Sequence, residues 1–185
     1  MRAVGMVVKK WPNRIRIGSA LIGGEEPTYV IAEAGVNHNG DLSLAMAMIE
    51  AAAVAGAQAV KFQAFAASRL VTRNAAAASY QQASSQYDLL ASLELHPDDF
   101  AALVSQCGNC RVEPLITPFS PEDVEMCVRL GMRAIKLASP EVANLPLLQQ
   151  VGRTKLPVIL STGACRLEEI DRAVEMLGDS GTTEL

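Results

Sequence analysis

Residues 29–54 read YVIAEAGVNHNGDLSLAMAMIEAAAV, and this stretch decides the fold. The run Tyr29 to Ala34 is nearly continuous in apolar character, which is typical of a strand buried in a parallel sheet. Asp41 can cap a following helix, and Gly56 can end it. Apolar residues recur between them at helical spacing on one face; these are Leu42, Ala45, Met46, Ile49 and Ala53. The stretch therefore predicts one strand–loop–helix unit.

The same pattern repeats four more times along the chain. The five apolar runs are Tyr29 to Ala34, Ala59 to Phe62, Val112 to Ile116, Ala134 to Leu137 and Val158 to Leu160. Each precedes a segment of helical periodicity, and Gly108 and Gly178 are expected to end two of these helices. Alternating strands and helices predict an α/β fold, either an open doubly wound sheet or a (β/α) barrel. A complete barrel has eight units in about 250 residues, so about five units predict a partial TIM barrel.

Two segments lie outside this rhythm. Arg14 to Ile22 alternates around a Gly18-Ser19 turn, which predicts a β-hairpin. We therefore expect residues 1–28 to form an N-terminal hairpin or cap, and residues 29–185 to form the first five βα units of a barrel. Residues 66–93 separate the second strand from the next strong helical pattern, and a stretch of this length is either a helical insertion or a functional loop.

Composition excludes several classes of protein. Half of the 185 residues are hydrophobic and 19% are charged, which predicts a packed core. A net charge of −4 and an aromatic content of 4% argue against a nucleic-acid partner. No apolar run is long enough for a membrane span or a signal peptide, so we expect a soluble, cytoplasmic protein. Four cysteines in a chain of this length do not indicate a disulfide framework.

Polar side chains lie at or just beyond the carboxyl ends of all five predicted strands. They are Glu33, Lys61, Gln63, Thr117, Lys136, Ser139, Ser161 and Thr162. Because ligands of parallel α/β proteins bind at the carboxyl ends of the strands, we expect these side chains to converge there. Two lysines among several hydroxyl groups suit an anion that carries a phosphate or a carboxylate.

Two other motifs are open to a structural interpretation. The loop 37–41 contains His38 and could contact a ligand, but Asn-Gly and Asp are also ordinary turn and cap residues. Cys107 and Cys110 have CxxC spacing, yet Cys107 falls at the end of a predicted helix rather than at its N-terminus, which disfavours a redox role. A zinc site would need two more ligands nearby.

Five motifs together carry a resemblance to a known family. They occur in order at residues 31–41, 60–63, 117–119, 135–139 and 160–163. Together they are similar to the N-terminal catalytic part of the sialic acid synthase family, which includes N-acetylneuraminate synthase and its legionaminate and pseudaminate relatives. The likeness runs from about Tyr29 to Leu177 and includes the insertion, with Tyr80-Gln81 and Tyr87.

The resemblance implies a fold and an activity. The family has a (β/α)8 barrel followed by a small antifreeze-like domain, and it forms homodimers. Its members condense phosphoenolpyruvate with an N-acetylmannosamine-type sugar to a nine-carbon 2-keto acid and release phosphate. The resemblance assigns the phosphoenolpyruvate ligands to Lys61, Thr117, Lys136, Ser139 and Ser161. It puts Glu33 and Gln63 beside the reacting centre with Lys61, and Phe119 and Glu141 near the sugar.

The sequence departs from the family pattern at two points. Pro140 stands where a glycine commonly follows the serine, so the backbone beside Ser139 and Glu141 is expected to differ. The sequence also stops where a sixth strand is expected, without the later barrel units and the antifreeze-like domain. The family's divalent metal, Mn²⁺ or Mg²⁺, has its two histidine ligands in that later part. We therefore expect no metal ligand within these residues and no full activity from them alone.

Three rival functions stay open at this point. One is another phosphoenolpyruvate-dependent aldol synthase on a similar barrel. Another is an aldolase that forms a Schiff base through Lys61 or Lys136. The third is a catalytically inactive protein that binds an anion or a partner subunit.

Overall fold

The computed structural model describes residues 11–76 and 85–185. The predicted insertion is therefore seen in part, and Tyr80 and Gln81 lie outside the described residues. Two short helices flank the gap, α2 (Ala67–Leu70) and α3 (Gln86–Leu93). Within the described part of the chain, no helix has the length and apolar character needed to cross a membrane.

The predicted strands all form, and they run parallel to one another. One sheet has the order β3 (Ile31–Gly35), β4 (Ala59–Ala64) and β5 (Glu113–Pro118), and β6 (Ile135–Leu137) pairs with β7 (Val158–Leu160). Among the described residues, no ladder joins β5 to β6, but these two strands are in contact. The strands therefore neighbour each other in chain order, as in a barrel and not in a doubly wound sheet. The partial barrel predicted from the sequence is confirmed.

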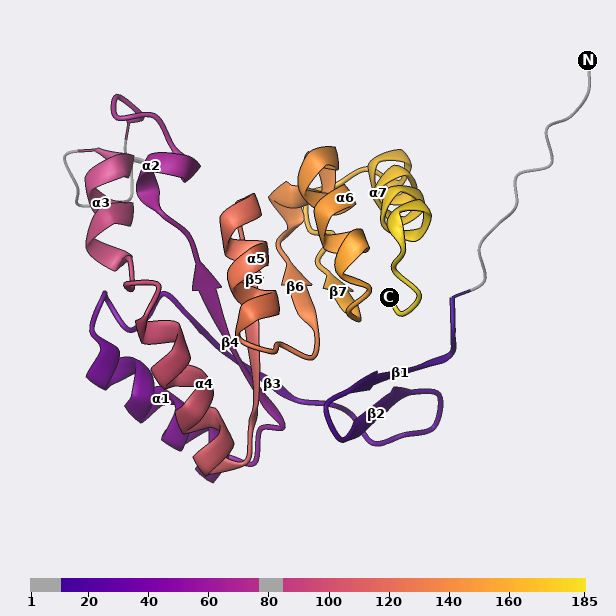
Figure 1. Cartoon of the computed structure of the whole chain (residues 1–185), viewed down its shortest axis with the longest axis horizontal. Helices are drawn as coiled ribbons and strands as arrows, with labels where there is room; N and C mark the ends of the chain where they lie inside the picture. Colours follow the sequence, from indigo (N-terminus) through magenta and orange to yellow (C-terminus); the bar gives the residue numbers. More distant parts are fainter. Residues whose placement is uncertain (1–10, 77–84) are drawn as a thin grey trace, which may run out of the picture.

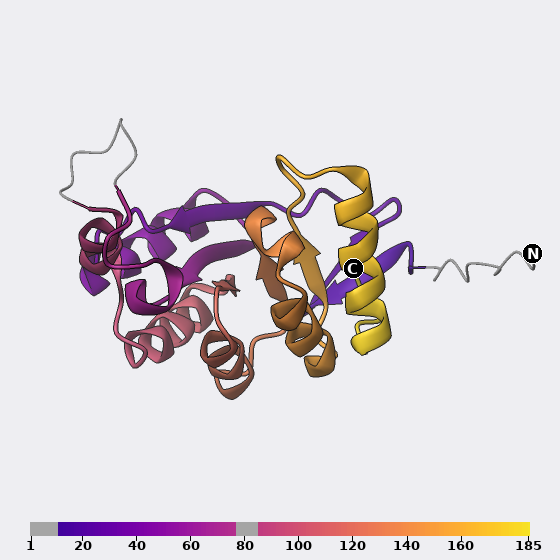
Figure 2. The same ribbon diagram turned by 90° about the horizontal axis from the view of Figure 1, so that it is seen from above.

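Helices follow the strands in the same order. They are α1 (Leu42–Val54), α4 (Asp99–Cys110), α5 (Pro121–Arg129), α6 (Leu145–Thr154) and α7 (Leu167–Ser180), with a 3₁₀ turn η1 (Ser139–Ala143) after β6. Figure 1 shows their sequence along the molecule, and Figure 2 shows α4, α5 and α6 side by side along one side of the strands. Asp41 caps α1 by accepting the N–H groups of Ser43 and Leu44, as predicted.

Two predicted helix ends are wrong. Gly108 and Gly178 lie inside α4 and α7, which continue to Cys110 and Ser180. Arg111 adopts the left-handed conformation after α4, with φ of 58°, so a non-glycine residue supplies the turn there. A glycine signals that a helix can end, but the packing of the last turn decides where it does.

The N-terminal hairpin also forms, as β1 (Arg14–Ile17) and β2 (Ala20–Gly23) around Gly18 and Ser19. Ile17 packs with Ala59, Leu115 and Ala134. Ala59 begins β4, Leu115 lies in the first half of β5, and Ala134 directly precedes β6. The hairpin therefore covers the amino-terminal end of the strands. A domain boundary at residue 28 stays a prediction.

Candidate active site

The period of two along a strand explains which side chains reach the site. In β4, Val60 and Phe62 belong to the large core between strands and helices. Ala59 belongs instead to the small cluster on the opposite face, beneath the hairpin. Successive side chains alternate between faces, so Lys61 and Gln63 share the face of Ala59.

The other strands repeat this arrangement. Leu115 and Ala134 belong to the same small cluster, and Ile31 and Ile159 pack against it. The residues two positions further on, towards the carboxyl ends, are Thr117, Lys136, Glu33 and Ser161. The inner face therefore has an apolar layer beneath the hairpin and, one layer closer to the carboxyl ends, a polar layer. The polar layer contains both predicted lysines.

Lys61 is the most buried cation of this layer. Its side chain is 7% exposed, and its Nζ lies 2.7 Å from Oε1 of Glu33, whose side chain is 58% exposed. The register pairs the two residues directly across β3 and β4. Burial of an ammonium group is costly without a partner, and the Glu33 carboxylate supplies one.

Gly35 allows Glu33 to lie where it does. The register shifts between Glu33 and Gly35, and Gly35 has a φ of 57°. A Cβ at this position would lie 2.9 Å from Oε1 of Glu33 and 3.8 Å from Nε2 of Gln63. The absence of a side chain at residue 35 thus makes room for the carboxylate of Glu33, whereas the distance to Gln63 is an ordinary van der Waals contact.

Lys136 lies close enough to Lys61 for their charges to interact. Burial lowers the pKa of Lys136, and the positive charge of Lys61 lowers it further, while Glu33 acts in the opposite direction. The Nζ of Lys136 donates hydrogen bonds to Oγ of Ser161 at 2.6 Å and to the carbonyl oxygen of Leu137 at 2.9 Å. Two partly desolvated cations on one face favour an anion between them.

Hydroxyl groups complete this face. Thr117 is buried, and its Oγ1 has no hydrogen-bond partner within the described structure. Ser139 lies near the loop after β7, because a Cβ on Gly163 would lie 3.9 Å from its Oγ and Sγ of Cys165 contacts its carbonyl oxygen at 3.5 Å. Ser161 already accepts from Lys136. Ser161 and Lys136 are thus brought together, and Ser139 lies beside the loop that follows Ser161.

Two predicted sugar ligands lie in the surrounding loops. The ring of Phe119 packs edge-on against Phe65, with the centroids 6.2 Å apart. Glu141 is buried in η1, where its Oε2 accepts from Asn144 at 2.7 Å. Burial raises the pKa of Glu141, and the Asn144 hydrogen bond opposes that change. The structure ties Glu141 to the cap of α6, and its role toward a sugar stays a prediction.

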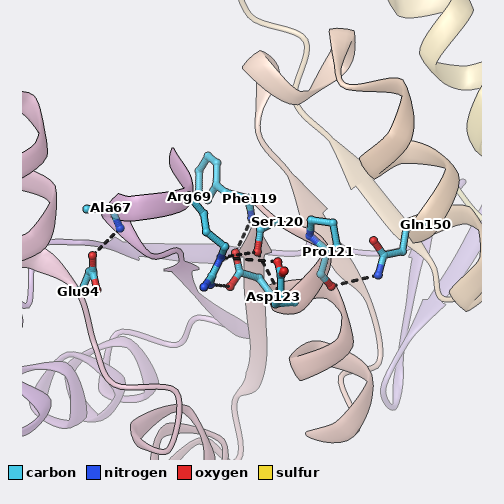
Figure 3. Close-up of polar contacts among 9 residues, drawn as sticks. Ala67, Arg69, Glu94, Phe119, Ser120, Pro121, Asp123 and Gln150 are labelled. Carbon is cyan, nitrogen blue, oxygen red and sulfur yellow. Dashed lines mark hydrogen bonds and ion pairs between the residues drawn. The ribbon is translucent and has the colours of Figure 1, made fainter. Parts of the chain in front are cut away.

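Sequence reasoning missed a set of polar residues beside Phe119. Figure 3 shows Arg69 of α2 reaching across to Ser120 and Asp123 at the start of α5. The strand-end rule overlooks Arg69 because it belongs to the insertion, and it overlooks Asp123 because an acid in a first helical turn has an ordinary structural explanation.

The loop 37–41 has turn and cap geometry, and its contact with a ligand stays a prediction; Nε2 of His38 is buried without a hydrogen-bond partner in the described structure. His38 is buried, its ring packs 6.2 Å from that of Phe62, and its Nδ1 accepts from the N–H of Gly40. Burial lowers the pKa of His38, so its imidazole is neutral at pH 7. Asn39 and Gly40 take positive φ values in the turn that Asp41 ends.

The CxxC cysteines have no redox-active geometry. Both thiols are free, and Cys107 is buried in the last turns of α4. Burial, followed by the neighbouring Cys110, raises the pKa of Cys107 to about 12. The thiol is therefore protonated at neutral pH and is a poor nucleophile.

The described residues do not fit the divalent metal ion that the resemblance implies. Within residues 11–76 and 85–185, no group of three or more His, Cys, Asp or Glu side chains is placed to hold one. His38 is buried beside Phe62, and His96 is exposed beside Asp98.

These features define a class of protein: an α/β-barrel protein with a cationic site at the carboxyl ends of its strands. The sequence model of the NeuB family matches residues 48–185, so the chain belongs to the NeuB family. It is 40% identical over 158 residues to an N,N'-diacetyllegionaminic acid synthase of Legionella pneumophila, a match that covers 83% of this chain and 44% of that protein.

Two further similarities agree with this membership. A second N,N'-diacetyllegionaminic acid synthase, from Campylobacter jejuni, is 40% identical over 159 residues, covering 83% of this chain and 48% of the relative. The crystal structure of an N-acetylneuraminic acid synthetase from Leptospira borgpetersenii superposes with a TM-score of 0.82 at 32% identity, covering 92% of this chain and 57% of that one. The chain spans about half the length of the curated relatives it matches.

Proposed function

We propose that this chain supplies the phosphoenolpyruvate-binding part of a synthase that makes a nine-carbon 2-keto sugar acid. The observation that carries the proposal is the pair of neighbouring lysines, Lys61 and Lys136, on the inner face of the strands. The names of the relatives support the product class, since they include legionaminic and N-acetylneuraminic acid synthases. An N-acetylmannosamine-type sugar is the proposed second substrate.

The site chemistry suits phosphoenolpyruvate because this anion carries a phosphate and a carboxylate on one small carbon frame. Lys61 and Lys136 balance its negative charge, and hydroxyl groups from Thr117, Ser139 and Ser161 donate hydrogen bonds to its oxygens. Binding there also relieves the repulsion between the two lysines. The buried hydroxyl of Thr117 gains the partner that it lacks in the free chain.

In the proposed reaction, C3 of phosphoenolpyruvate forms a bond to the aldehyde carbon of the open-chain sugar. Water adds at C2, the C2–O bond to phosphate breaks, and the products are a 2-keto acid and inorganic phosphate. Glu33 lies 2.7 Å from Lys61 and is largely exposed, so it is the group best situated to transfer a proton at this centre. Gln63 orients the reactants, and Phe119 and Glu141 are the proposed sugar contacts.

The homodimer implied by the resemblance is part of the proposal.

A second candidate has one observation in its favour. The lowered pKa of Lys136 is a property of lysines that form Schiff bases with carbonyl substrates. Borohydride reduction in the presence of pyruvate separates the two functions. A covalent adduct at Lys136 would support an aldolase, whereas the synthase proposal expects none.

The proposed function is tested by titrating phosphoenolpyruvate into the chain and measuring heat or ³¹P line width. Lys61→Gln should weaken binding by at least about tenfold, since it removes a charge-assisted interaction. Lys155→Gln is the matched control, because Lys155 is exposed at the end of α6. Equal affinity in both variants, or no binding by the unmodified chain, would contradict the proposal.

A further inference from the structure

Asp123 joins two segments that are far apart in the sequence. Its side chain is only 7% exposed, and it lies in the first turn of α5. Oδ1 accepts from Nη2 of Arg69 at 2.9 Å, and Oδ2 accepts from the backbone N–H of Phe119 at 3.3 Å, as Figure 3 shows. One buried carboxylate thus holds both the loop after β5 and the helix after β4.

Arg69 makes a second contact to the same loop. Its Nε donates to Oγ of Ser120 at 3.1 Å, and that oxygen also accepts the N–H of Asp123 as the cap of α5. A planar guanidinium group can engage a hydroxyl and a carboxylate at once in a fixed geometry. The pair is therefore a directional link between α2 and α5 and not only an attraction of charges.

The helix that carries Arg69 is itself held in place. Glu94 accepts the N–H of Ala67 at the start of α2 (Figure 3). Two residues before Ala67, Phe65 packs against the ring of Phe119. The four-residue α2 is consequently anchored at its start, and it can hold the β5–α5 loop through Arg69.

This loop is short and leads directly to the proposed anion site. Only Phe119 and Ser120 separate the end of β5 at Pro118 from the start of α5 at Pro121. Prolines at both borders restrict φ to about −65°. Thr117 itself is paired with Gln63 in the β4–β5 ladder. Holding the N–H of Phe119 fixes the path of the chain just beyond Thr117, whose buried hydroxyl has no partner in the described structure.

We propose that Arg69 and Asp123 are positioning residues, whose ion pair holds the β5–α5 loop so that the Thr117 hydroxyl donates to bound phosphoenolpyruvate. The inference rests on the proposed function, and neither residue contacts the anion itself. It extends the site from the strand ends to α2 of the insertion, whose Arg69 would then contribute indirectly to ligand binding.

The binding test uses Asp123→Asn and Arg69→Gln, with two matched controls on the exposed side of α5, Glu125→Gln and Arg129→Gln. We expect phosphoenolpyruvate affinity to fall about tenfold in the first two variants, the scale of one charge-assisted hydrogen bond, and to stay within twofold in the controls. Unchanged affinity in Asp123→Asn would overturn the proposal.

A thermodynamic cycle with Thr117→Val separates positioning from general stability. If Asp123 acts through Thr117, Asp123→Asn should change affinity less than twofold once the Thr117→Val substitution has removed the hydroxyl. A loss as large as in the unmodified background would show that Asp123 acts elsewhere and would overturn the proposal. Arg69→Lys keeps the positive charge but loses the planar guanidinium group that contacts Ser120 and Asp123 together. It should therefore recover only part of the phosphoenolpyruvate affinity that is lost in Arg69→Gln.

Hydrogen exchange in the ligand-free chain tests the same link without any substrate. The Phe119 amide should exchange at least about tenfold faster in Asp123→Asn and Arg69→Gln, while amides of β4 keep their rates and so report an intact fold. Unchanged exchange at Phe119 would refute the positioning role. If the chain binds no phosphoenolpyruvate but Phe119 exchange responds as expected, the proposed function fails and the loop-holding pair stands.

Discussion

Lys136 shows how the fold alters a single side chain. Its pKa is lowered mainly by burial, then by the charge of Lys61, while Glu33 raises it. Because the pKa is lower in the folded chain than in the unfolded chain, the unfolded chain binds more protons between the two values. The free energy of unfolding therefore rises with pH between the lowered pKa of Lys136 in the folded chain and its ordinary value near 10.5.

The first prediction concerns this titration. Observed by ¹³C NMR at Cε, Lys136 should titrate below 10.5. Lys61→Met should move its pKa upward, because a neighbouring positive charge is removed, and Glu33→Gln should move it downward. Added phosphoenolpyruvate should also raise it. Identical titration in both variants would mean that the three groups do not share one site.

Single residues also mark how far the sequence could predict the site. Lys61, Thr117, Lys136 and Ser161 were predictable because they lie at the carboxyl ends of apolar runs, where parallel α/β proteins bind their ligands. Their catalytic and binding roles stay predictions. Asp123 was not predictable as part of the site, since its importance depends on the approach of Arg69 across 54 positions.

At the scale of elements, the N-terminal hairpin meets the barrel at an ion pair between the buried Glu113 and the exposed Arg133. Glu113 at the start of β5 is almost fully buried, and its carboxylate binds Arg133 through Nε at 2.9 Å and Nη2 at 2.7 Å. The hairpin turn lies directly on this carboxylate. A Cβ at Gly18 would clash with Oε2 of Glu113, and Gly18 has a φ of 58°.

The second prediction follows from that contact. Gly18→Ala should lower the free energy of unfolding by about 1–2 kcal/mol for its left-handed backbone, and by about 1–2 kcal/mol more for displacing Glu113. Gly56→Ala is the control, because Gly56 has a φ of 82° and open space around it. Urea unfolding measures both variants, and the extra loss should disappear in a Glu113→Ala background. Equal losses in the two variants would exclude a role for the Glu113 contact.

The elements themselves were largely predictable, and their ends less so. Five apolar runs gave five strands because each is bounded by turn residues and followed by a helical pattern. Gly108 and Gly178 were wrong as helix ends because each is tolerated inside a helix whose last turn still packs. Asp41 was a reliable cap, since its side chain accepts N–H groups of the first turn of α1.

At the scale of the whole molecule, the row of strands leaves β3 and β7 without a strand neighbour on one side among the described residues. An apolar groove of about 450 Å³ lies between them. It is lined by the hairpin, by Tyr29 and Ile31, by β7, and by Ile170 and Val174 of α7. In a closed barrel of eight strands, such a surface packs against further units. The count of five units in the sequence was enough to predict this opening.

The last prediction is that a polypeptide of these 185 residues associates with itself through this groove. Apolar area that leaves water contributes about 25 cal/mol per Å², so covering the apolar lining of this groove with a second copy favours self-association. Val174→Lys puts a charge into the groove and should shift sedimentation toward the monomer. Leu167→Lys, on the same helix but already 76% exposed and outside the groove, should leave association unchanged.

Thermal melting of both variants checks that the fold is retained. A concentration-independent monomer in the unmodified polypeptide, or an equal effect of the two lysines, would show that the groove does not drive association.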